Sequence, residues 1–431
     1  MELRDKIQKR DAKVAIIGLG YVGLPLAVDA AKAGFKVTGI DMQDSKVNLI
    51  NNGKNYIGDV ADDDLREVVK NKNLQAVKDF AIIKDMDVIV ICVPTPLNKY
   101  KEPNISYVQN VSKEISKYIK KDSLVILEST TYPGTTEEIV QTEIEKSGLK
   151  AGDDFFLVFS PERVDPGNKK YKTHNIPKVI GGINERSSEL ASAFYGSFIE
   201  KTHIVSSPRV AEMTKLLENI FRIVNISMIN ELALLAGKMK IDIWEVIEAA
   251  STKPYGFMPF YPGPGLGGHC IPIDPFYLSW KAKEFDFYTR FISLAGEIND
   301  LMPHFVVTKV ISALNSVKKS VNGSKILVLG VAYKKDIEDL RESPALKIIK
   351  DLIKKGADFS YNDNYVPELK LEDKIFKSEK FTADTLQKAD CVLITTDHSY
   401  YDENLIVNNS KLIVDTRNVI KRRDLNNLFR L

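Results

Sequence analysis

Three groups of residues in this chain of 431 have types and spacings that could do chemistry. The first is Gly18-Leu19-Gly20-Tyr21-Val22-Gly23, which follows an apolar run and opens a helical pattern. In this GxGxxG pattern the glycines permit a tight turn, the approach of a pyrophosphate and close helix–strand packing. Asp41 ends the next apolar run, where its carboxylate would accept hydrogen bonds from a ribose diol and repel a 2′-phosphate. The pattern predicts a dinucleotide site that prefers NAD to NADP.

The second group is the segment from Gly263 to Asp274, GPGLGGHCIPID. Clustered glycines let a backbone wrap a ligand, and a thiol close to a helix start is in a setting that lowers a cysteine pKa. Position and neighbours leave two interpretations of Cys270 open, a nucleophile and a small buried residue. His269 is interpreted as structural, because adjacent side chains usually point apart. Cys92 and Cys391 fall in predicted strands and are interpreted as buried apolar residues.

The third group is Lys215 and Asn219 within one long helical pattern. Residues four apart lie on the same face of a helix. Spacing alone favours a solvated face here.

The composition bounds the partners and the compartment. Apolar residues make up 44% and charged residues 27%, with a net charge of +2, which favours a globular protein and gives no sign of a nucleic-acid or membrane partner. Three widely spaced cysteines fit a reducing compartment and exclude a disulfide scaffold and a cysteine-based zinc site. We expect a cytoplasmic protein with no metal.

The first half alternates short apolar runs with helical patterns, which is typical of a parallel sheet covered on both faces. The predicted strands are Val14–Gly18, Lys36–Ile40, Val88–Val93, Leu124–Leu127, Phe155–Val158 and Val179–Gly181, and the predicted helices are Leu24–Ala33, Ser106–Ile119 and Thr136–Lys146.

A helical middle follows, with one long helix from about Arg209 to Lys238 and another from Phe291 to Ser316 that Pro303 interrupts. Between them, Lys253–Pro275 is rich in proline and glycine, and its threaded apolar residues favour an ordered loop over a flexible linker.

After Gly323 the alternation of strands and helices returns as a second, smaller α/β unit. Its predicted elements are Lys325–Gly330, Pro344–Lys355, Asp358–Tyr361, Cys391–Thr395 and Lys411–Asp415. The expected domains are 1–205 for NAD, 206–318 as a helical dimerisation domain that carries the catalytic loop, and 319–431 as a second Rossmann-like domain for the sugar nucleotide.

Seven motifs in order give the chain a resemblance to the UDP-glucose/GDP-mannose dehydrogenase family over essentially its whole length. They are Gly18–Gly23, Val93–Pro96, Glu128–Thr135, Ser160–Arg163, Lys215 to Asn219, Gly267–Asp274 and Gly330–Ser343. Within the family, the segment Gly268–Leu278 most resembles the branch that acts on UDP-N-acetylhexosamines, above all on UDP-N-acetylglucosamine.

The resemblance implies an α/β fold of two Rossmann-like, doubly wound lobes joined by a long helix that supports a homodimer or higher oligomer. It implies cofactor contacts from Gly18, Gly20, Tyr21, Val22, Gly23, Asp41, Lys46, Thr95, Thr131 and Arg341. It implies UDP-sugar contacts from Glu162, Arg163, Lys215, Asn219, Tyr261, Gly263, Gly265, Gly267, Tyr333 and Lys334.

The resemblance also implies a four-electron oxidation at C6 of the sugar, in the supply of polysaccharide or glycan precursors. The Cys270 thiolate would add to the first-formed aldehyde, because the adduct regains the hydroxyl from which a second hydride can depart. Lys215 and Asn219 would stabilise the oxyanion at C6, a role in which one donor supplies ~3–4 kcal/mol. Hydrolysis of the thioester would fall to water oriented or deprotonated by Asp274, Glu162 or Thr131, and the resemblance leaves that choice open.

One departure stands out. Relatives that oxidise UDP-glucose usually place an arginine of a neighbouring subunit near the substrate, and Pro254–Pro264 contains none. Alternatives remain: the same chemistry on UDP-glucose or on another N-acetylhexosamine epimer, a two-electron hydroxyacid or sugar-acid dehydrogenase, and a cofactor sensor without catalysis. The joint presence of Cys270, Lys215, Asn219 and Asp274 argues against the sensor.

Overall fold

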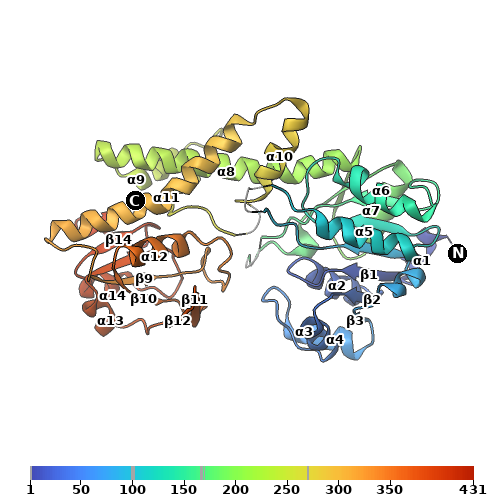
Figure 1. The fold of residues 1–431 in the computed structure, drawn as a ribbon, viewed down its shortest axis with the longest axis horizontal. Coiled ribbons are helices and arrows are strands. Elements are labelled where there is room, and N and C mark those ends of the chain that lie inside the picture. The colour runs from blue at the N-terminus through green and yellow to red at the C-terminus, as the bar shows by residue number, and fades with distance from the viewer. Residues whose placement is uncertain (1, 99–101, 166–167, 169, 269–270) are drawn as a thin grey trace. The chain divides into compact units, whose positions relative to one another are not determined.

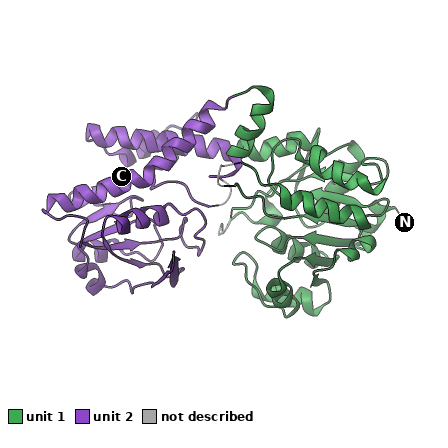
Figure 2. Cartoon of the chain, viewed as in Figure 1, with its two compact units in different colours: residues 1–218, 276–287 green, residues 219–275, 288–431 purple. Residues whose placement is uncertain are grey.

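The computed structural model describes residues 2–98, 102–165, 168, 170–268 and 271–431, so Cys270 and His269 lie outside the described residues. The chain divides into two compact units, one of Met1–Glu218 with Phe276–Phe287 and one of Asn219–Pro275 with Tyr288–Leu431 (Figure 2). Each unit holds one Rossmann-like sheet, and a long helix runs from the first unit into the second. The predicted fold class is confirmed, whereas the three domain boundaries stay a prediction.

The sheet of the first unit has the strand order β3-β2-β1-β4-β5-β6-β7-β8, and its first six strands follow the doubly wound dinucleotide-binding order. The strands are β1 (Lys13–Ile17), β2 (Lys36–Ile40), β3 (Leu74–Val77), β4 (Val88–Ile91), β5 (Leu124–Leu127), β6 (Phe156–Phe159), β7 (Lys178–Gly182) and β8 (Thr202–Val205). The predicted strands are confirmed, β2 and β5 with the same ends and the other four with ends shifted by one or two residues, and β3 and β8 were not predicted.

Side-chain alternation along the strands creates two cores, one on each face of this sheet. Val14 and Ile16 of β1 pack with apolar residues from α1, α2, α4 and α7 on one face. Ala15 and Ile17 pack with residues of α5 and α6 on the other. Burial on both faces explains why these strands read as continuous apolar runs.

The expectation of a wholly parallel sheet is wrong at β7, which pairs antiparallel to β6 through Val158 with Gly182 and Phe159 with Gly181. Because β7 runs backwards, its first residue, Lys178, lies beside the residues that follow β6. Continuing the register places Lys178 opposite Glu162.

The sheet of the second unit has the order β10-β9-β13-β14-β15 with every pair parallel. Counted within this sheet, the order is the other common doubly wound arrangement, 2-1-3-4-5. Its strands are β9 (Lys325–Leu329), β10 (Asp358–Asn362), β13 (Cys391–Ile394), β14 (Ile413–Asp415) and β15 (Leu428–Arg430), and β11 (Glu368–Leu371) with β12 (Lys374–Lys377) forms a separate hairpin.

Figure 1 shows the helices with their labels. In the first unit they are α1 (Leu3–Lys9), α2 (Gly23–Lys32), α3 (Asp44–Asn51), α4 (Asp62–Lys70), α5 (Ser106–Tyr118), α6 (Thr142–Ile144) and α7 (Glu185–Tyr195), with a π-helical segment Thr136–Gln141 before α6. The others are α8 (Pro208–Met239), α9 (Ile243–Ala250), α10 (Asp274–Ala282), α11 (Arg290–Ser316), α12 (Pro344–Lys354), α13 (Ala383–Lys388) and α14 (Glu403–Asn409).

The predicted interruption at Pro303 is wrong, because α11 continues through it. A proline removes the hydrogen bond to the carbonyl four residues earlier, here that of Asn299. Packing holds the helix together at this point, because Pro303 is buried in α11 against residues 263–268, which we call the glycine loop. A Cβ added at Gly265 would lie 3.5 Å from Pro303 Cδ and from the Asn299 oxygen.

One face of α8 carries a row of exposed apolar side chains at helical spacing. The row consists of Val210, Met213, Leu217, Phe221, Met228, Leu232, Leu235 and Met239. Within the described residues α8 is also the one helix whose length and composition would allow it to cross a membrane. A one-sided stripe beside buried Ala211, Leu216 and Ile223 is typical of a helix that packs against a partner.

Glu212 fastens the start of α8 to the turn that precedes the π-helical segment. Its carboxylate accepts the Gly134 N–H at 2.6 Å, the Thr136 N–H at 2.9 Å and the Thr136 hydroxyl at 2.7 Å. Burial raises the pKa of Glu212 to about 7, although these three donors lower it. The contact fixes the helix turn that carries Lys215.

The Glu212 contact predicts a pH-dependent stability. The raised pKa means that the folded chain binds a proton on the Glu212 carboxyl more tightly than the unfolded chain does. The free energy of unfolding should therefore fall as pH rises from 4.5 through about 7. The change amounts to ~3 kcal/mol. Thermal unfolding of Glu212→Gln and of the wild type at pH 5 and pH 8 should show the variant gaining relative stability at the higher pH.

Glu231→Gln, at an exposed position of the same helix, is the matched control and should follow the wild type. A difference between Glu212→Gln and the wild type that is equal at both pH values would contradict this prediction.

Candidate active site

Parallel strands place the residues that follow them at one edge of the sheet. In the first unit this edge receives a set of sequence-predicted site residues: Gly18 after β1, Asp41 after β2, Thr95 after β4, Thr131 after β5 and Glu162 after β6. The strand order reverses between β1 and β4, which is where ligands bind in open α/β sheets.

The three fingerprint glycines have separate steric reasons. Gly18 has φ +92°, and a Cβ there would lie 2.5 Å from the Cys92 carbonyl oxygen. A Cβ at Gly23 would overlap the Gly18 oxygen, so α2 can pack this closely only on a glycine. Gly20 has nothing within 4 Å of its added Cβ, which leaves open space where a pyrophosphate would approach.

Asp41 is buried and only partly committed to the protein. Its Oδ2 accepts the Leu19 N–H at 3.0 Å and Lys46 Nζ at 3.1 Å, and its Oδ1 accepts the Gln43 N–H at 3.0 Å. A carboxylate has about four acceptor positions, so capacity remains for a ribose hydroxyl. Lys46 lies in the predicted cofactor site through this ion pair.

Thr131 has a buried hydroxyl oxygen with no hydrogen-bond partner among the described residues. A buried polar atom of this kind calls for a ligand or water. Thr95 is buried too, and its carbonyl accepts the Tyr277 hydroxyl of α10 at 2.7 Å. The open space at Gly20, the spare capacity of Asp41 and this hydroxyl together fit a bound dinucleotide.

Glu162 belongs to a buried cluster that the sequence did not reveal in full. Lys178 Nζ lies 3.3 Å from Glu162 Oε2 and 3.1 Å from Glu128 Oε1, and the Tyr195 hydroxyl donates to the same Glu128 oxygen. Glu162 Oε1 also accepts the backbone N–H groups of residue 163 at 2.6 Å and of residue 164 at 2.7 Å. The reversed direction of β7 is what brings Lys178 here.

The cluster keeps Glu162 ionised. Burial opposes ionisation, but Lys178, the two backbone N–H groups and Lys215 together lower the pKa of Glu162. Burial acts in the same direction on Glu128, where it outweighs Lys178 and raises the pKa. Glu162 is thus a fixed negative charge in the field of Lys215, a buried lysine of α8. Such a carboxylate orients cations and hydroxyls better than it removes protons.

Asn219 and Asp274 are brought together in the second unit. The Asn219 amide donates to Asp274 Oδ2 at 2.6 Å, and both residues are buried. Asp274 is the first residue of α10, where the helix dipole favours a carboxylate. This hydrogen bond therefore joins α8, the helix that carries Lys215, to the first residue of α10, which follows the glycine loop in the sequence.

The glycine loop is held by hydrogen bonds from both of its ends. The Gly263 N–H donates to Asn230 Oδ1 at 2.9 Å, and Asn230 bonds to Asn299 of α11 at 2.9 Å. The Gly268 N–H donates to the Arg341 carbonyl at 2.9 Å. Added Cβ atoms at Gly267 and Gly268 would meet the Tyr333 side chain. The two segments predicted to bind the substrate, Tyr261–Gly267 and Tyr333–Lys334, thus contact each other through Gly267 and Tyr333.

Two predicted arginines have protein partners. The Arg163 guanidinium pairs with Glu218 of α8 at 2.7 Å and donates to the Pro177 carbonyl at 2.7 Å. Arg341 forms a bidentate pair with Asp339, the shorter contact being 2.6 Å. Their assigned ligand contacts stay predictions.

Arg417 is a residue that the sequence reasoning missed. It follows β14, its Nε donates to the Thr395 carbonyl at 3.1 Å, and its Nη1 would lie 2.7 Å from a Cβ at Gly263. Burial lowers the pKa of Arg417, which Asp397 and Asp415 oppose. A guanidinium against the glycine loop suits an anionic ligand. Its position just after a predicted strand was the available signal.

Three family models match in the same order as these features. They are the NAD binding, central and UDP binding domains of the UDP-glucose/GDP-mannose dehydrogenase family, over residues 12–199, 209–301 and 327–422. The chain belongs to this family. It is an NAD-dependent UDP-sugar dehydrogenase, and NAD is its cofactor.

Individual relatives cover nearly the whole chain. A UDP-N-acetyl-D-mannosamine dehydrogenase of Pyrococcus horikoshii is 36% identical over 97% of this chain and 98% of the relative. A UDP-N-acetyl-D-glucosamine 6-dehydrogenase of Pseudomonas aeruginosa is 38% identical over 80% of each chain. The solved structure of the Pyrococcus horikoshii UDP-D-ManNAc dehydrogenase superposes with a TM-score of 0.88 at 33% identity, over 97% of this chain and 98% of that one.

Asp41 gives a direct test of the cofactor site. Asp41→Asn keeps an acceptor for the Leu19 N–H but removes the negative charge, so NAD should bind about tenfold more weakly and the preference over NADP should shrink. Calorimetric titration with NAD, NADP and UDP measures this, and UDP affinity should not change. Asp44→Asn, at an exposed residue paired with Lys78, is the control. Unchanged NAD affinity in Asp41→Asn would remove Asp41 from the site.

Proposed function

We propose that this protein oxidises the C6 alcohol of a UDP-N-acetylhexosamine to a carboxylate, using two NAD and a covalent intermediate on Cys270. The observation that carries the proposal is the buried hydrogen bond between Asn219 and Asp274. Asp274 follows Cys270 closely in the sequence, and Lys215 stands one helical turn before Asn219. A two-electron dehydrogenase has no need of a cysteine in addition to these residues.

The proposed reaction consists of two oxidations, one thiolate addition and one hydrolysis. NAD, held by the Gly18–Gly23 turn and Asp41, would supply the hydride acceptor for both oxidations at C6, and a proton leaves the C6 oxygen each time. Between them the Cys270 sulfur bonds to the aldehyde carbon, and the carbonyl oxygen takes up a proton. Water then displaces the thiolate from the thioester, giving the carboxylate. The net change is one alcohol, two NAD and one water to one carboxylate, two NADH and three protons.

Lys215 and Asn219 are the donors for the oxygen at C6. Lys215 is buried close to Glu162, whose lowered pKa favours the carboxylate, so the ammonium is positioned before the oxyanion forms. Asn219 is oriented by Asp274 through the 2.6 Å hydrogen bond. Asp274 is the candidate to activate water, since Glu162 is a weak base with its lowered pKa. Thr131 remains a candidate to orient that water.

The hexosamine is the finer part of the proposal. The glycine-loop segment favours UDP-N-acetylglucosamine, and the absence of arginine from Pro254–Pro264 argues against the UDP-glucose arrangement. Similar relatives carry the names of both UDP-N-acetylglucosamine and UDP-N-acetylmannosamine dehydrogenases. UDP-N-acetylmannosamine is therefore the second candidate. We further propose a cytoplasmic location, a role in polysaccharide or glycan precursor supply, and a homodimer or higher oligomer.

Stoichiometry tests the reaction. The wild type should produce two NADH for each UDP-N-acetylglucosamine or UDP-N-acetylmannosamine consumed, and UDP-glucose should be the poorer substrate. Cys270→Ser should lower the four-electron rate at least about a hundredfold, because a serine hydroxyl is a much poorer nucleophile toward the aldehyde than a cysteine thiolate. NADH absorbance with product mass measures both quantities.

Cys391→Ala, at a buried residue of β13, is the matched control and should keep the stoichiometry of two. One NADH per substrate in the wild type, or full activity of Cys270→Ser, would contradict the mechanism. A clear preference for UDP-glucose would contradict the substrate assignment alone.

The apolar row on α8 supports the oligomer. Burying one leucine in an interface contributes ~1.5–3 kcal/mol, so Leu235→Asp should shift the sedimentation profile toward the monomer. Glu231→Gln, an exposed change on the same helix, should leave it unaltered. A monomeric wild type would exclude this proposal.

A further inference from the structure

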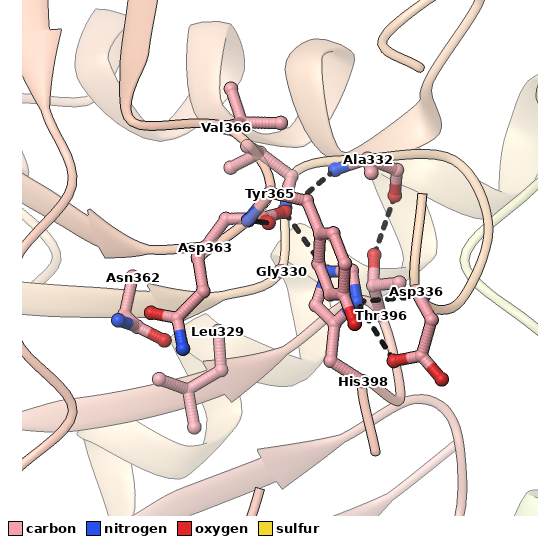
Figure 3. A network of polar contacts seen from close by, with 12 residues as sticks. Leu329, Gly330, Ala332, Asp336, Asn362, Asp363, Tyr365, Val366, Thr396 and His398 are labelled. Carbon is pink, nitrogen blue, oxygen red and sulfur yellow. Dashed lines mark hydrogen bonds and ion pairs between the residues drawn. The ribbon is translucent and has the colours of Figure 1, made fainter. Parts of the chain in front are cut away.

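His398 lies in the segment that follows β13 in the second lobe, and its side chain is fully buried. Its ring packs against two tyrosines, with Tyr400 stacked at 5.5 Å and 10° and Tyr365 at 5.0 Å between ring centroids. Figure 3 shows the ring with its polar neighbours. Nothing in the proposed chemistry uses this histidine.

The two ring nitrogens have opposite roles. The Asp336 backbone N–H points at His398 Nδ1 at 3.0 Å, and since an amide N–H can only donate, Nδ1 must accept. In a neutral imidazole the other nitrogen then carries the proton. His398 Nε2 lies 3.0 Å from Asp363 Oδ2, an acceptor that matches this tautomer (Figure 3).

Asp363 is itself fixed from the other side. Its Oδ2 accepts the N–H groups of Val331 at 2.8 Å and Ala332 at 3.1 Å. It follows β10 as Asp41 follows β2 in the first lobe, so the carboxylate serves as a rigid anchor on the sheet edge. The imidazole therefore bridges a fixed carboxylate and the backbone of Asp336.

Asp336 is the point where the segment Tyr333–Arg341 is held down. It has φ +59°, which is uncommon for a residue other than glycine and needs local support. Its carboxylate accepts the Ser399 N–H at 2.8 Å and the Ser399 hydroxyl at 2.5 Å. His398 and Ser399 thus fasten both the backbone and the side chain of one strained residue.

The fastened segment supports the glycine loop. Tyr333 packs on Gly267 and Gly268, and the Arg341 carbonyl accepts the Gly268 N–H at 2.9 Å. Gly268 stands two residues before Cys270 in the sequence. The same segment carries Tyr333 and Lys334, which the family resemblance assigns to the sugar nucleotide.

We propose that His398 is a positioning residue for UDP-sugar binding. By accepting the Asp336 N–H it holds the Tyr333–Arg341 segment, and with it the glycine loop, in the shape that binds the nucleotide. The inference rests on the proposed function of the second lobe as the UDP-sugar site.

Two substitutions separate the effects of the two hydrogen bonds that the His398 ring forms, one with Asp336 and one with Asp363. An asparagine amide reaches about as far as Nδ1, so His398→Asn can still accept the Asp336 N–H with its oxygen. A glutamine amide reaches about as far as Nε2, so His398→Gln keeps the donor to Asp363 but loses the acceptor. His304→Gln, at an exposed histidine of α11, is the matched control.

The experiment is calorimetric titration of the full-length protein with UDP and, separately, with NAD, alongside thermal unfolding. His398→Gln should bind UDP about fivefold to tenfold more weakly, the effect of one lost hydrogen bond to the segment. His398→Asn should stay within about threefold of the wild type, and NAD affinity should be unchanged in all variants.

Three outcomes would overturn the inference: equal UDP affinity in both variants and the wild type, a larger loss in His398→Asn than in His398→Gln, or a parallel loss of UDP and NAD affinity. A wild type that binds NAD but not UDP would instead overturn the proposed function of the lobe, so the two failures are distinguishable.

Discussion

A polar group buried at the carboxyl edge of a parallel sheet needs a partner, from the protein or from a ligand, because burial without one is costly. Lys178 meets this requirement for the site. Its ammonium bridges Glu128 and Glu162 in the interior, and the antiparallel course of β7 is what places it there. With that cation in place Glu162 stays charged, and Lys215 faces a fixed negative neighbour. The oxyanion donors of the proposed reaction depend on this buried arrangement.

The two lobes use one device for two purposes. In each, a carboxylate after the second strand accepts backbone N–H groups from the turn after the first strand: Asp41 from Leu19, and Asp363 from Val331 and Ala332. In the first lobe the glycine at position 20 leaves space beside the turn. In the second lobe Val331 and Ala332 are buried, and His398 forms a hydrogen bond with the Asp363 carboxylate. The same topology can thus present a dinucleotide crevice once and a closed anchor the second time.

Much of the fold could be predicted from the sequence, because strands buried on both faces are continuous apolar runs. The short strands β8 and β15 were missed because THIV and LFR mix polar with apolar residues and are not buried, so neither gives that signal. Strand direction at β7 depends on tertiary packing, which periodicity does not report. Local patterns therefore found the glycine fingerprint and Asp41, whereas Lys178, Arg417 and His398 act through contacts distant in sequence. Pro303 shows the reverse case, in which packing overrides a strong local signal.

The central claim is that the sulfur of Cys270 carries the sugar between the two oxidations. Acid quenching of the wild type during turnover with NAD and UDP-N-acetylglucosamine or UDP-N-acetylmannosamine, followed by peptide mass analysis, tests it most directly. We expect an adduct with the mass of the uronyl thioester on the peptide that contains Cys270, and this adduct should disappear when the substrate is exhausted. NADH formation with no adduct on that peptide in rapidly quenched samples, or with a free aldehyde as the final product, would contradict it.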